Sequence, residues 1–434
     1  MDIKTATMDE RKEEVRKLVE KFKSNEGYYK SKDFDETNTR KEFIDPFLEC
    51  LGWDVRNTLG KNPNRREVIA EDRVIINGTT KHPDYTLRYG IEDILYIEAK
   101  QPSVNIHTDK APAYQVRRYA YTSKMPIALL TDFEELSVYE TTQKPKEKDN
   151  AAKCRIGYYK YDQYVEKFEE IYNRFSWEAV DKGSFDEYYK NDNNKRGTTT
   201  VDKDILTMIE DWRSNLANDI AKNNASIDEY HLTSCVQKII DRIIFLRICE
   251  DKEIEPADTL LNAAKSPNVF VALKTIFTNA NVKFNAGLFA PDPCLDGLSI
   301  PDNTLKSIIE SLYYPNCPYE FSVLPVEILG NIYEKFLGKI LRFNRKTVTG
   351  HSIVIEEKPE VKKAGGVFYT PKFVVDYIVE HTIGVKLKNK TPNEVESMRF
   401  LDPACGSGSF LIGAFQYLMD WHLDYYLSKQ SITS

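Results

Sequence analysis

Apolar positions in the first 180 residues follow helical spacing at first and strand-like spacing later. Residues 8–24 predict an amphipathic helix rich in Glu and Lys, and a second helix extends from near Thr37 to Gly52. Short apolar runs that are typical of strands follow at 68–69, 73–77, 85–88, 94–99 and 126–131. Asn77-Gly78 predicts a tight turn, and a helix at 114–120 separates the last two strands. This pattern indicates one α/β domain over residues 1–180.

The rest of the chain is mostly helical in pattern. A polar stretch at 181–200 is typical of a linker, and it opens an α-helical connector predicted over 181–320, with long helices at 205–222 and 231–250. The third region, 321–434, predicts in order a helix at 325–341, a charged stretch near 343–366, a helix at 371–385, a strand at 399–401, a Gly-rich turn and a helix at 409–428. We therefore expect three domains.

Composition narrows the class of protein. Apolar residues make up 41% of the chain and charged residues 29%, which indicates a globular protein rather than a disordered one. No apolar run approaches the roughly 18 residues that cross a bilayer, so we expect no membrane partner. The seven cysteines include no CxxC pair, which favours reduced thiols and a cytoplasmic location. The net charge of −7 argues only weakly against nucleic-acid binding, because that depends on where Lys and Arg lie.

The first domain contains two acidic positions that precede a lysine. Pro83-Asp84 is followed, after thirteen residues, by Glu98-Ala99-Lys100. Strand alternation in ILYIEAK puts Glu98 and Lys100 on one face, and an adjacent strand beginning near Asp84 brings a second carboxylate beside them. Two carboxylates and a few waters suit Mg²⁺, which polarises a phosphate and acidifies a water. The alternative is a strand with ordinary surface charges, since a lone ExK is common.

Neighbouring residues support the functional interpretation. Gln115 and Tyr119 lie one helical turn apart, so both can face the same site, with Arg117 and Arg118 available for phosphate. Upstream, Glu36 and Glu42 flank the start of the second helix, where one more acid can reach the metal. Each has an ordinary alternative: Glu36 suits a helix N-terminus, and Tyr119 suits the core.

Six segments between about residues 35 and 140 carry a resemblance: DETNTRKEFIDPFLECLGWDV, REVIAEDRV, KHPDYTLRY, YIEAKQPSVNI, APAYQVRRYAY and LLTDFEELSVYE. Together they resemble the amino-terminal nuclease of single-chain, type IIG-like restriction-modification enzymes, which belongs to the PD-(D/E)XK class. The resemblance implies a mixed sheet flanked by helices and site-specific hydrolysis of double-stranded DNA. Implied catalytic residues are Asp84, Glu98, Lys100 and Gln115, and the implied Mg²⁺ ligands are Asp84, Glu98 and, favoured over Glu42, Glu36. Double-strand cleavage would suit a homo-oligomer.

A second motif lies near the end of the chain, in LDPACGSGSFL at 401–411. A strand, a turn with Gly406 and Gly408, and a helix from Ser409 suit a nucleotide-like ligand, although Leu411 stands where a dinucleotide fingerprint needs a third glycine. With GGVFYTPKFVVDYIV at 365–379, the motif resembles the S-adenosylmethionine site of N6-adenine DNA methyltransferases, and thus the start of a Rossmann-like domain. The resemblance implies cofactor contacts from Tyr369, Thr370, Pro371, Asp402, Ala404, Cys405, Gly406 and Gly408.

One departure from that family limits the expectation. The (D/N/S)PP(Y/F) motif that holds the flipped base is missing, and Asn316-Cys317-Pro318-Tyr319 fits only a turn upstream of the cofactor motif. The strand expected to follow the cofactor turn, with the acid that holds the cofactor ribose, is missing as well. We therefore expect an incomplete cofactor site, with methylation only in a longer protein. Two other hypotheses stay open: a non-catalytic remnant that binds DNA or a partner, and a protein that acts mainly as an adenine methyltransferase when full length.

Overall fold

The structure, a computed structural model, describes residues 2–70, 83–90, 92–189, 201–285, 287–325, 328, 330, 338–344, 352–359 and 370–430. The chain forms two compact units. Unit 1 comprises Met1–Ile205, Phe245–Asn262 and Ile309–Leu324, and unit 2 comprises Leu206–Ile244, Ala263–Ile308 and Pro325–Ser434. This division differs from the predicted boundaries near 180 and 320. Residues 181–205, 245–262 and 309–320 of the predicted connector belong to unit 1, because packing between residues far apart in sequence defines a unit.

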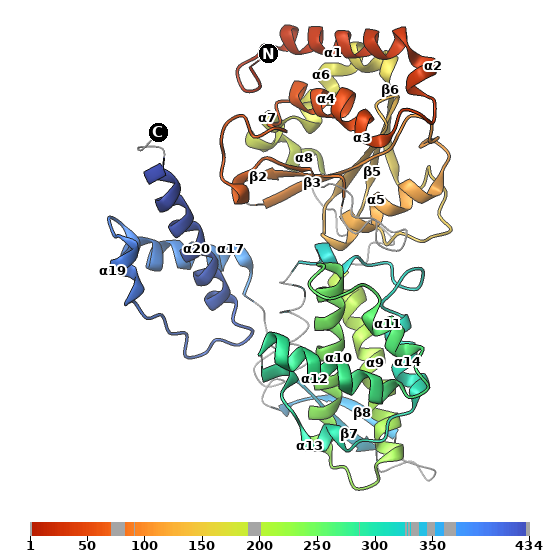
Figure 1. The fold of residues 1–434 in the computed structure, drawn as a ribbon, viewed down its shortest axis with the longest axis vertical. Helices are drawn as coiled ribbons and strands as arrows, with labels where there is room; N and C mark the ends of the chain where they lie inside the picture. Colours follow the sequence, from red (N-terminus) through yellow and green to blue (C-terminus); the bar gives the residue numbers. More distant parts are fainter. Residues whose placement is uncertain are drawn as a thin grey trace. The chain divides into compact units, whose positions relative to one another are not determined.

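Unit 1 contains a six-stranded mixed sheet in the order β1-β2-β3-β4-β5-β6 (Figure 1). Its strands are β1 (Val68–Ala70), β2 (Tyr85–Tyr89), β3 (Glu92–Ala99), β4 (Ile127–Thr131), β5 (Glu135–Glu140) and β6 (Arg155–Lys160). Only β3 and β4 are parallel, because helix α5 (Lys110–Thr122) returns the chain between them. The mixed sheet is therefore confirmed. The predicted strand 73–77 and the Asn77-Gly78 turn lie outside the described residues.

The two faces of the sheet are covered by different helices (Figure 1). Leu95, Ile97 and Ala99 of β3 join the larger core cluster, with side chains from α1 (Met8–Ser24), α4 (Asp45–Cys50) and α6 (Tyr164–Phe175). Tyr96 points the other way, into a cluster with Val116, Tyr119 and Ala120 of α5. Strand alternation therefore directs Glu98, two residues after Tyr96, to the α5 face.

The other helices of this part of the chain are short. The predicted helix from Thr37 to Gly52 forms as α3 (Glu36–Thr39), a π-helical turn (Arg40–Ile44) and α4. The remaining short helices are α2 (Glu26–Tyr29), α7 (Trp177–Asp181) and α8 (Ser184–Tyr189). Helix α8 occupies the first part of the predicted linker, where Phe185 is buried, and residues 190–200 lie outside the described part.

The predicted connector is helical. Its helices are α9 (Val201–Asn223), α10 (Glu229–Asp251), α11 (Thr259–Ala264), α12 (Val269–Phe284), α13 (Pro293–Asp296) and α14 (Asp302–Glu310). Strands β7 (Lys339–Asn344) and β8 (Ser352–Glu357) form an antiparallel pair. The predicted helix 325–341 is thus wrong at its end, where residues 339–341 pair with β8. In the described part of the chain, no helix combines the length and apolar character needed to cross a membrane.

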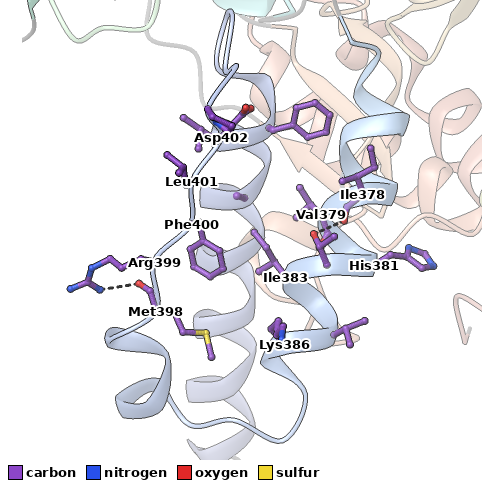
Figure 2. A pocket seen from close by; sticks show the side chains of 16 residues that line it. Ile378, Val379, His381, Ile383, Lys386, Met398, Arg399, Phe400, Leu401 and Asp402 are labelled. Carbon is purple, nitrogen blue, oxygen red and sulfur yellow. Dashed lines mark hydrogen bonds between the residues drawn. The ribbon is translucent and has the colours of Figure 1, made fainter.

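Residues 370–430 form a small helical assembly. Its elements are α17 (Lys372–Val379), a π-helical turn (Glu380–Gly384), α18 (Val385–Leu387), α19 (Pro392–Glu396) and α20 (Ser409–Gln430). Val379, Ile383 and Met398, drawn in Figure 2, contribute to its apolar cluster. The strand predicted at 399–401 is wrong: these residues form no regular element, and a strand needs a hydrogen-bonded partner that the described residues do not supply. The described residues 370–430 thus form helices and a turn with no strand among them, and the expected Rossmann-like start stays a prediction.

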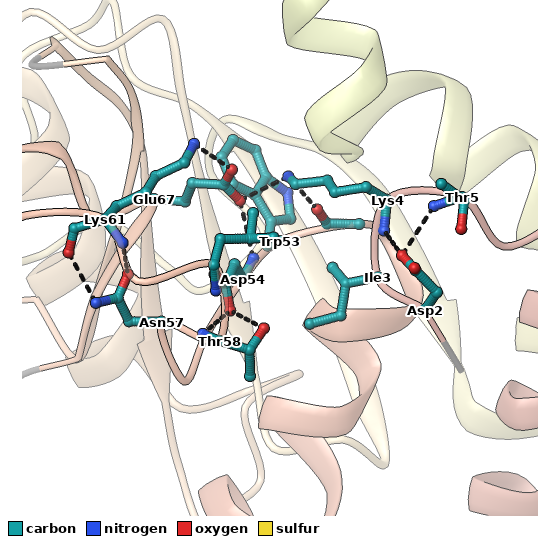
Figure 3. Close-up of polar contacts among 12 residues, drawn as sticks. Asp2, Ile3, Lys4, Thr5, Trp53, Asp54, Asn57, Thr58, Lys61 and Glu67 are labelled. Carbon is teal, nitrogen blue, oxygen red and sulfur yellow. Dashed lines mark hydrogen bonds and ion pairs between the residues drawn. The ribbon is translucent and has the colours of Figure 1, made fainter. Parts of the chain in front are cut away.

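A buried polar network ties the N-terminus to the edge of the sheet in unit 1 (Figure 3). The buried Glu67 carboxylate accepts hydrogen bonds from Lys4 Nζ at 2.7 Å, Lys61 Nζ at 2.8 Å and the backbone N–H of Asp54 at 2.9 Å. The Lys4 ammonium also lies 3.8 Å from the centroid of the Trp177 ring. Burial lowers the pKa of Lys4, and Glu67 opposes that shift. Because Glu67 immediately precedes β1, the network fixes the strand that pairs with β2.

Replacing Glu67→Gln should destabilise unit 1 by about 2–3 kcal/mol, because it leaves the buried end of Lys4 without a compensating charge. Urea unfolding followed by tryptophan fluorescence measures the loss, since Trp53 and Trp177 lie at this network. The matched control is Glu13→Gln, whose ion pair with Arg16 is exposed and should matter little. Equal midpoints for the two variants would contradict a stabilising role for the network.

Candidate active site

The strand register brings Asp84 and Glu98 together. Tyr85 pairs with Ile97 in the antiparallel β2–β3 ladder, so one further step puts Asp84 opposite Glu98. Directly opposed residues point to the same face, with Cβ atoms about 4.5–5.5 Å apart. The backbone N–H of Ala99 donates a 2.7 Å hydrogen bond to Asp84 Oδ2, and both carboxylate side chains are fully buried. Two acidic groups thus meet inside the protein at the end of β3.

Lys100 lies between two carboxylates at this position. Its Nζ donates a hydrogen bond to Glu98 Oε1 and lies 4.0 Å from Glu36 Oε2. Its backbone N–H donates to Thr131 O at 2.9 Å, which continues the β3–β4 pairing and fixes the lysine. Glu42, by contrast, forms a surface ion pair with Lys21 at 2.9 Å. The structure therefore favours Glu36 over Glu42 as the additional acid of this centre.

Arg40 belongs to the centre and was missed in the sequence. Its Nη1 lies 3.9 Å from Asp84 Oδ1, and its Nη2 donates to Asp84 O at 3.3 Å. Its guanidinium lies over the Tyr85 ring at 4.7 Å. Burial lowers the pKa of Arg40, but Tyr85, Asp84 and Asp45 outweigh it, so the side chain stays cationic. The sequence did contain one indication of this role. Arg40 lies one helical turn after Glu36, so the two side chains are neighbours.

Helix α5 brings Gln115 and Tyr119 to the same face of the sheet. Asp109 caps the helix by accepting a 3.0 Å hydrogen bond from Ala111 N–H. Tyr119 is fully buried and is close enough to Glu98 for that carboxylate to affect its ionisation. Burial, with help from Glu320 and Glu98, raises the pKa of Tyr119 well above its usual value, while Arg118 and a hydrogen bond with Gln115 oppose this shift. Tyr119 is therefore a neutral hydroxyl beside the carboxylates.

The expectation that Arg117 and Arg118 are available for phosphate is wrong. Arg117 is buried and pairs with Asp149 at 3.1 Å. Arg118 pairs with Glu320 in the interior of unit 1. Both guanidinium groups are therefore paired with carboxylates from later parts of the chain, Asp149 partly exposed and Glu320 buried.

Two carboxylates of this centre have the chemistry to bind a hard divalent cation. Carboxylate oxygens are the ligands that Mg²⁺ prefers, and it is usually held by one or two of them plus water and phosphate oxygens. Asp84 and Glu98 supply such a pair. Among the described residues, no group of three or more His, Cys, Asp or Glu side chains is arranged to hold a metal ion. The predicted three-ligand set with Glu36 therefore stays a prediction, and the register supports only its Asp84–Glu98 part.

The second candidate site is the turn before α20. Gly406 and Gly408 have φ of 53° and 81°, a region that favours glycine, and Gly408 N–H donates to Cys405 O at 2.7 Å. Ala404 N–H donates to Asp402 Oδ1 at 3.0 Å. The turn therefore bends tightly into the N-terminus of a long helix. Thr370 and Pro371 lie just before α17, and the predicted contact Tyr369 lies outside the described residues.

An open groove of about 900 Å³ lies beside this turn (Figure 2). It is lined mainly by apolar side chains of α17, the following π-helical turn, residues 398–403 and the start of α20. Of the predicted cofactor residues, Asp402 lines the groove, whereas Thr370, Pro371, Ala404, Cys405, Gly406 and Gly408 do not. The lining of the groove therefore includes only one of the predicted cofactor contacts, Asp402.

Comparison with known proteins gives one family match and two relatives. Residues 353–430 match the N-6 DNA Methylase family model. Over 421 residues, or 96% of the chain, the sequence is 38% identical to the type II restriction enzyme and methyltransferase RM.Eco57I of Escherichia coli. The chain is a relative of the type II restriction and methyltransferase enzymes. The predicted resemblance to restriction-modification enzymes is thereby confirmed.

A more distant relative covers the same share of the chain. The putative type II restriction enzyme and methyltransferase RM.MjaORFECS2P of Methanocaldococcus jannaschii is 24% identical over 537 aligned residues, again 96% of the chain. The chain spans 42% and 43% of the lengths of these two relatives. No solved structure matches the chain.

Proposed function

We propose that the first domain is a magnesium-dependent, site-specific endonuclease for double-stranded DNA, joined to an S-adenosylmethionine-dependent N6-adenine methyltransferase domain. The observation that carries the nuclease proposal is the β2–β3 register, which puts Asp84 opposite Glu98 beside Lys100. The restriction-enzyme names of the relatives support it. A hard cation, a buried acidic pair and an adjacent ammonium group suit phosphodiester hydrolysis.

In this proposal, Asp84 and Glu98 hold the Mg²⁺, with Glu36 as a further acid nearby. When bound, the ion polarises the scissile phosphate and lowers the pKa of a water. Lys100, held by Glu98 and close to Glu36, orients the attacking water and offsets the negative charge that develops on the phosphate. Gln115, which is only partly buried, holds the substrate by a hydrogen bond on the α5 side, and the buried Tyr119 hydroxyl orients Gln115. Arg40 holds the backbone at Asp84 in place.

The methyltransferase proposal depends on the turn before α20. Gly406 and Gly408 let the backbone approach a ligand, and the helix N-terminus presents free N–H groups. Thr370, Pro371, Asp402, Ala404 and Cys405 are the other proposed cofactor contacts in the described part of the chain. Membership of residues 353–430 in the N-6 DNA methylase family supports this assignment.

Substitutions in the acidic centre test the nuclease. Asp84→Asn, Glu98→Gln and Lys100→Met should each reduce DNA cleavage about 100-fold or more, because each removes a charge that acts on the reacting phosphate. Nicking of supercoiled plasmid measures the rates, and circular dichroism checks that each variant folds. Glu42→Gln, which alters only the surface pair with Lys21, should cleave like the parent chain. Parent-like cleavage by all three centre variants would refute the assignment.

Metal dependence tests the role of Glu36. A chelator should abolish cleavage, and added Mg²⁺ should restore it. Glu36→Gln should raise the Mg²⁺ concentration for half-maximal cleavage about tenfold, because a carboxylate near the ion contributes to its binding. Glu42→Gln is the matched control on the same stretch of helix. If both variants need the same Mg²⁺ concentration as the parent, Glu36 is not part of the metal site.

Cofactor binding tests the methyltransferase domain. Calorimetry should detect S-adenosylmethionine binding to the parent chain, and Asp402→Ala should weaken it about tenfold, since the residue holds the turn through Ala404 N–H. Asp420→Ala, further along α20 where the carboxylate accepts a hydrogen bond from Gln416, is the control. Absence of binding heat with the parent chain would favour the non-catalytic hypothesis for this region.

A further inference from the structure

A segment from the predicted connector is attached to the helix that borders the nuclease centre. Arg118 of α5 forms an ion pair with Glu320, and both side chains are largely buried. Glu320 N–H donates to Thr122 Oγ1 at 3.1 Å, and Ser123 Oγ donates to Val323 O at 2.9 Å. These three contacts join residues 320–323 to the C-terminal end of α5. All of them lie within unit 1.

The same segment is fixed on its other side by the end of α10. Phe321 N–H donates to Asp251 Oδ2 at 3.3 Å, and Asp251 forms a buried ion pair with Arg247. Arg247 Nε also donates to Leu312 O at 3.1 Å. Tyr313 OH donates to Glu250 Oε2 at 2.6 Å. Residues 312–321 are therefore held on both sides by directional contacts, rather than by apolar packing alone.

Tyr119 links this attachment to the nuclease centre. It follows Arg118 directly in α5, and its buried ring packs in the same cluster as Tyr96, which lies two residues before Glu98 on β3. The Arg118 guanidinium lies 6.0 Å from the Tyr119 ring centroid and 5.8 Å from that of Tyr314. A buried ion pair contributes orientation more reliably than stability, because desolvation offsets much of its attraction. The position of Arg118 therefore bears on how α5 presents Gln115 and Tyr119.

We infer that Glu320 and Arg118 form a positioning pair, through which the segment Ile309–Leu324 sets the placement of α5 and hence of Gln115 and Tyr119 beside Glu98. This inference rests on the proposed nuclease function. It makes the nuclease centre depend on residues far beyond the first 180. Neither residue of the pair reaches the acidic centre itself, so their effect passes through α5.

Kinetic analysis of the full chain separates positioning from simple support of the fold. In the double variant Arg118→Met/Glu320→Leu, apolar side chains of similar size replace both buried charges, which commonly preserves stability. We expect kcat for cleavage to fall about 10- to 100-fold, because small displacements of positioning groups are costly. KM for DNA and the Mg²⁺ requirement should stay near parent values. Glu320→Gln alone leaves the buried Arg118 charge without its partner, so it should lower kcat at least as far. Parent-like kcat in a folded double variant would overturn the inference.

Hydrogen exchange provides a readout that does not need cleavage. In Glu320→Gln, amides of α5 should exchange faster, while those of β5 should exchange as in the parent chain. The control Glu147→Gln removes a surface carboxylate that accepts a 2.9 Å hydrogen bond from Tyr314 OH, and it should leave α5 unchanged. Unchanged exchange in α5 of Glu320→Gln would overturn the positioning role. A parent chain that does not cleave DNA would instead refute the nuclease proposal, and α5 exchange would still decide the placement.

Discussion

The arrangement of unit 1 depends on two buried carboxylates that face each other, one directly before β2 and one near the end of β3. Burying an acidic group is costly unless cations and hydrogen-bond donors compensate it. Asp84 receives the Ala99 N–H and lies near Arg40, and Glu98 receives the Lys100 ammonium. The stretch from α3 into its π-helical turn contributes to this compensation, because it carries Arg40. Charge compensation thus adds to the core packing of Phe43 and Ile44 in holding this stretch, whose helix begins at the Asp35 N-cap.

The two faces of the sheet have separate tasks. One face packs against α1, α4 and α6 in the larger apolar cluster, which anchors the strands. The other face carries Tyr96 and Glu98 toward α5, where the smaller cluster ends at the polar centre. Because successive side chains of β3 point to opposite faces, the strand contributes both to the apolar core and to the polar centre. A one-residue slip of the β2–β3 register would turn Asp84 to the opposite face from Glu98.

Sequence patterns predicted the features that depend only on residues close together in the chain. Alternation in ILYIEAK predicted that Glu98 and Lys100 share a face, and helical spacing predicted that Gln115 and Tyr119 lie together. The partners of Arg40, Arg117 and Arg118 come from distant parts of the chain, so no local pattern identified them. The strand predicted at 399–401 has strand-like residues, but a strand also requires a partner. Unit boundaries escaped prediction for the same reason: segments that return to a unit leave no linker in the sequence.

The return of residues 245–262 and 309–324 to unit 1 gives α5, which borders the acidic centre, partners from distant parts of the chain. Apolar contacts tolerate sliding, whereas an ion pair with hydrogen bonds on both sides allows few arrangements. Arg118–Glu320 and Arg247–Asp251 are ion pairs with hydrogen bonds on both sides, and both are buried. A chain that needed only stability at this position would gain as much from apolar side chains. The retention of buried charge where α5 meets a distant segment is therefore best explained by a need for orientation, and the groups that α5 orients are those facing Glu98.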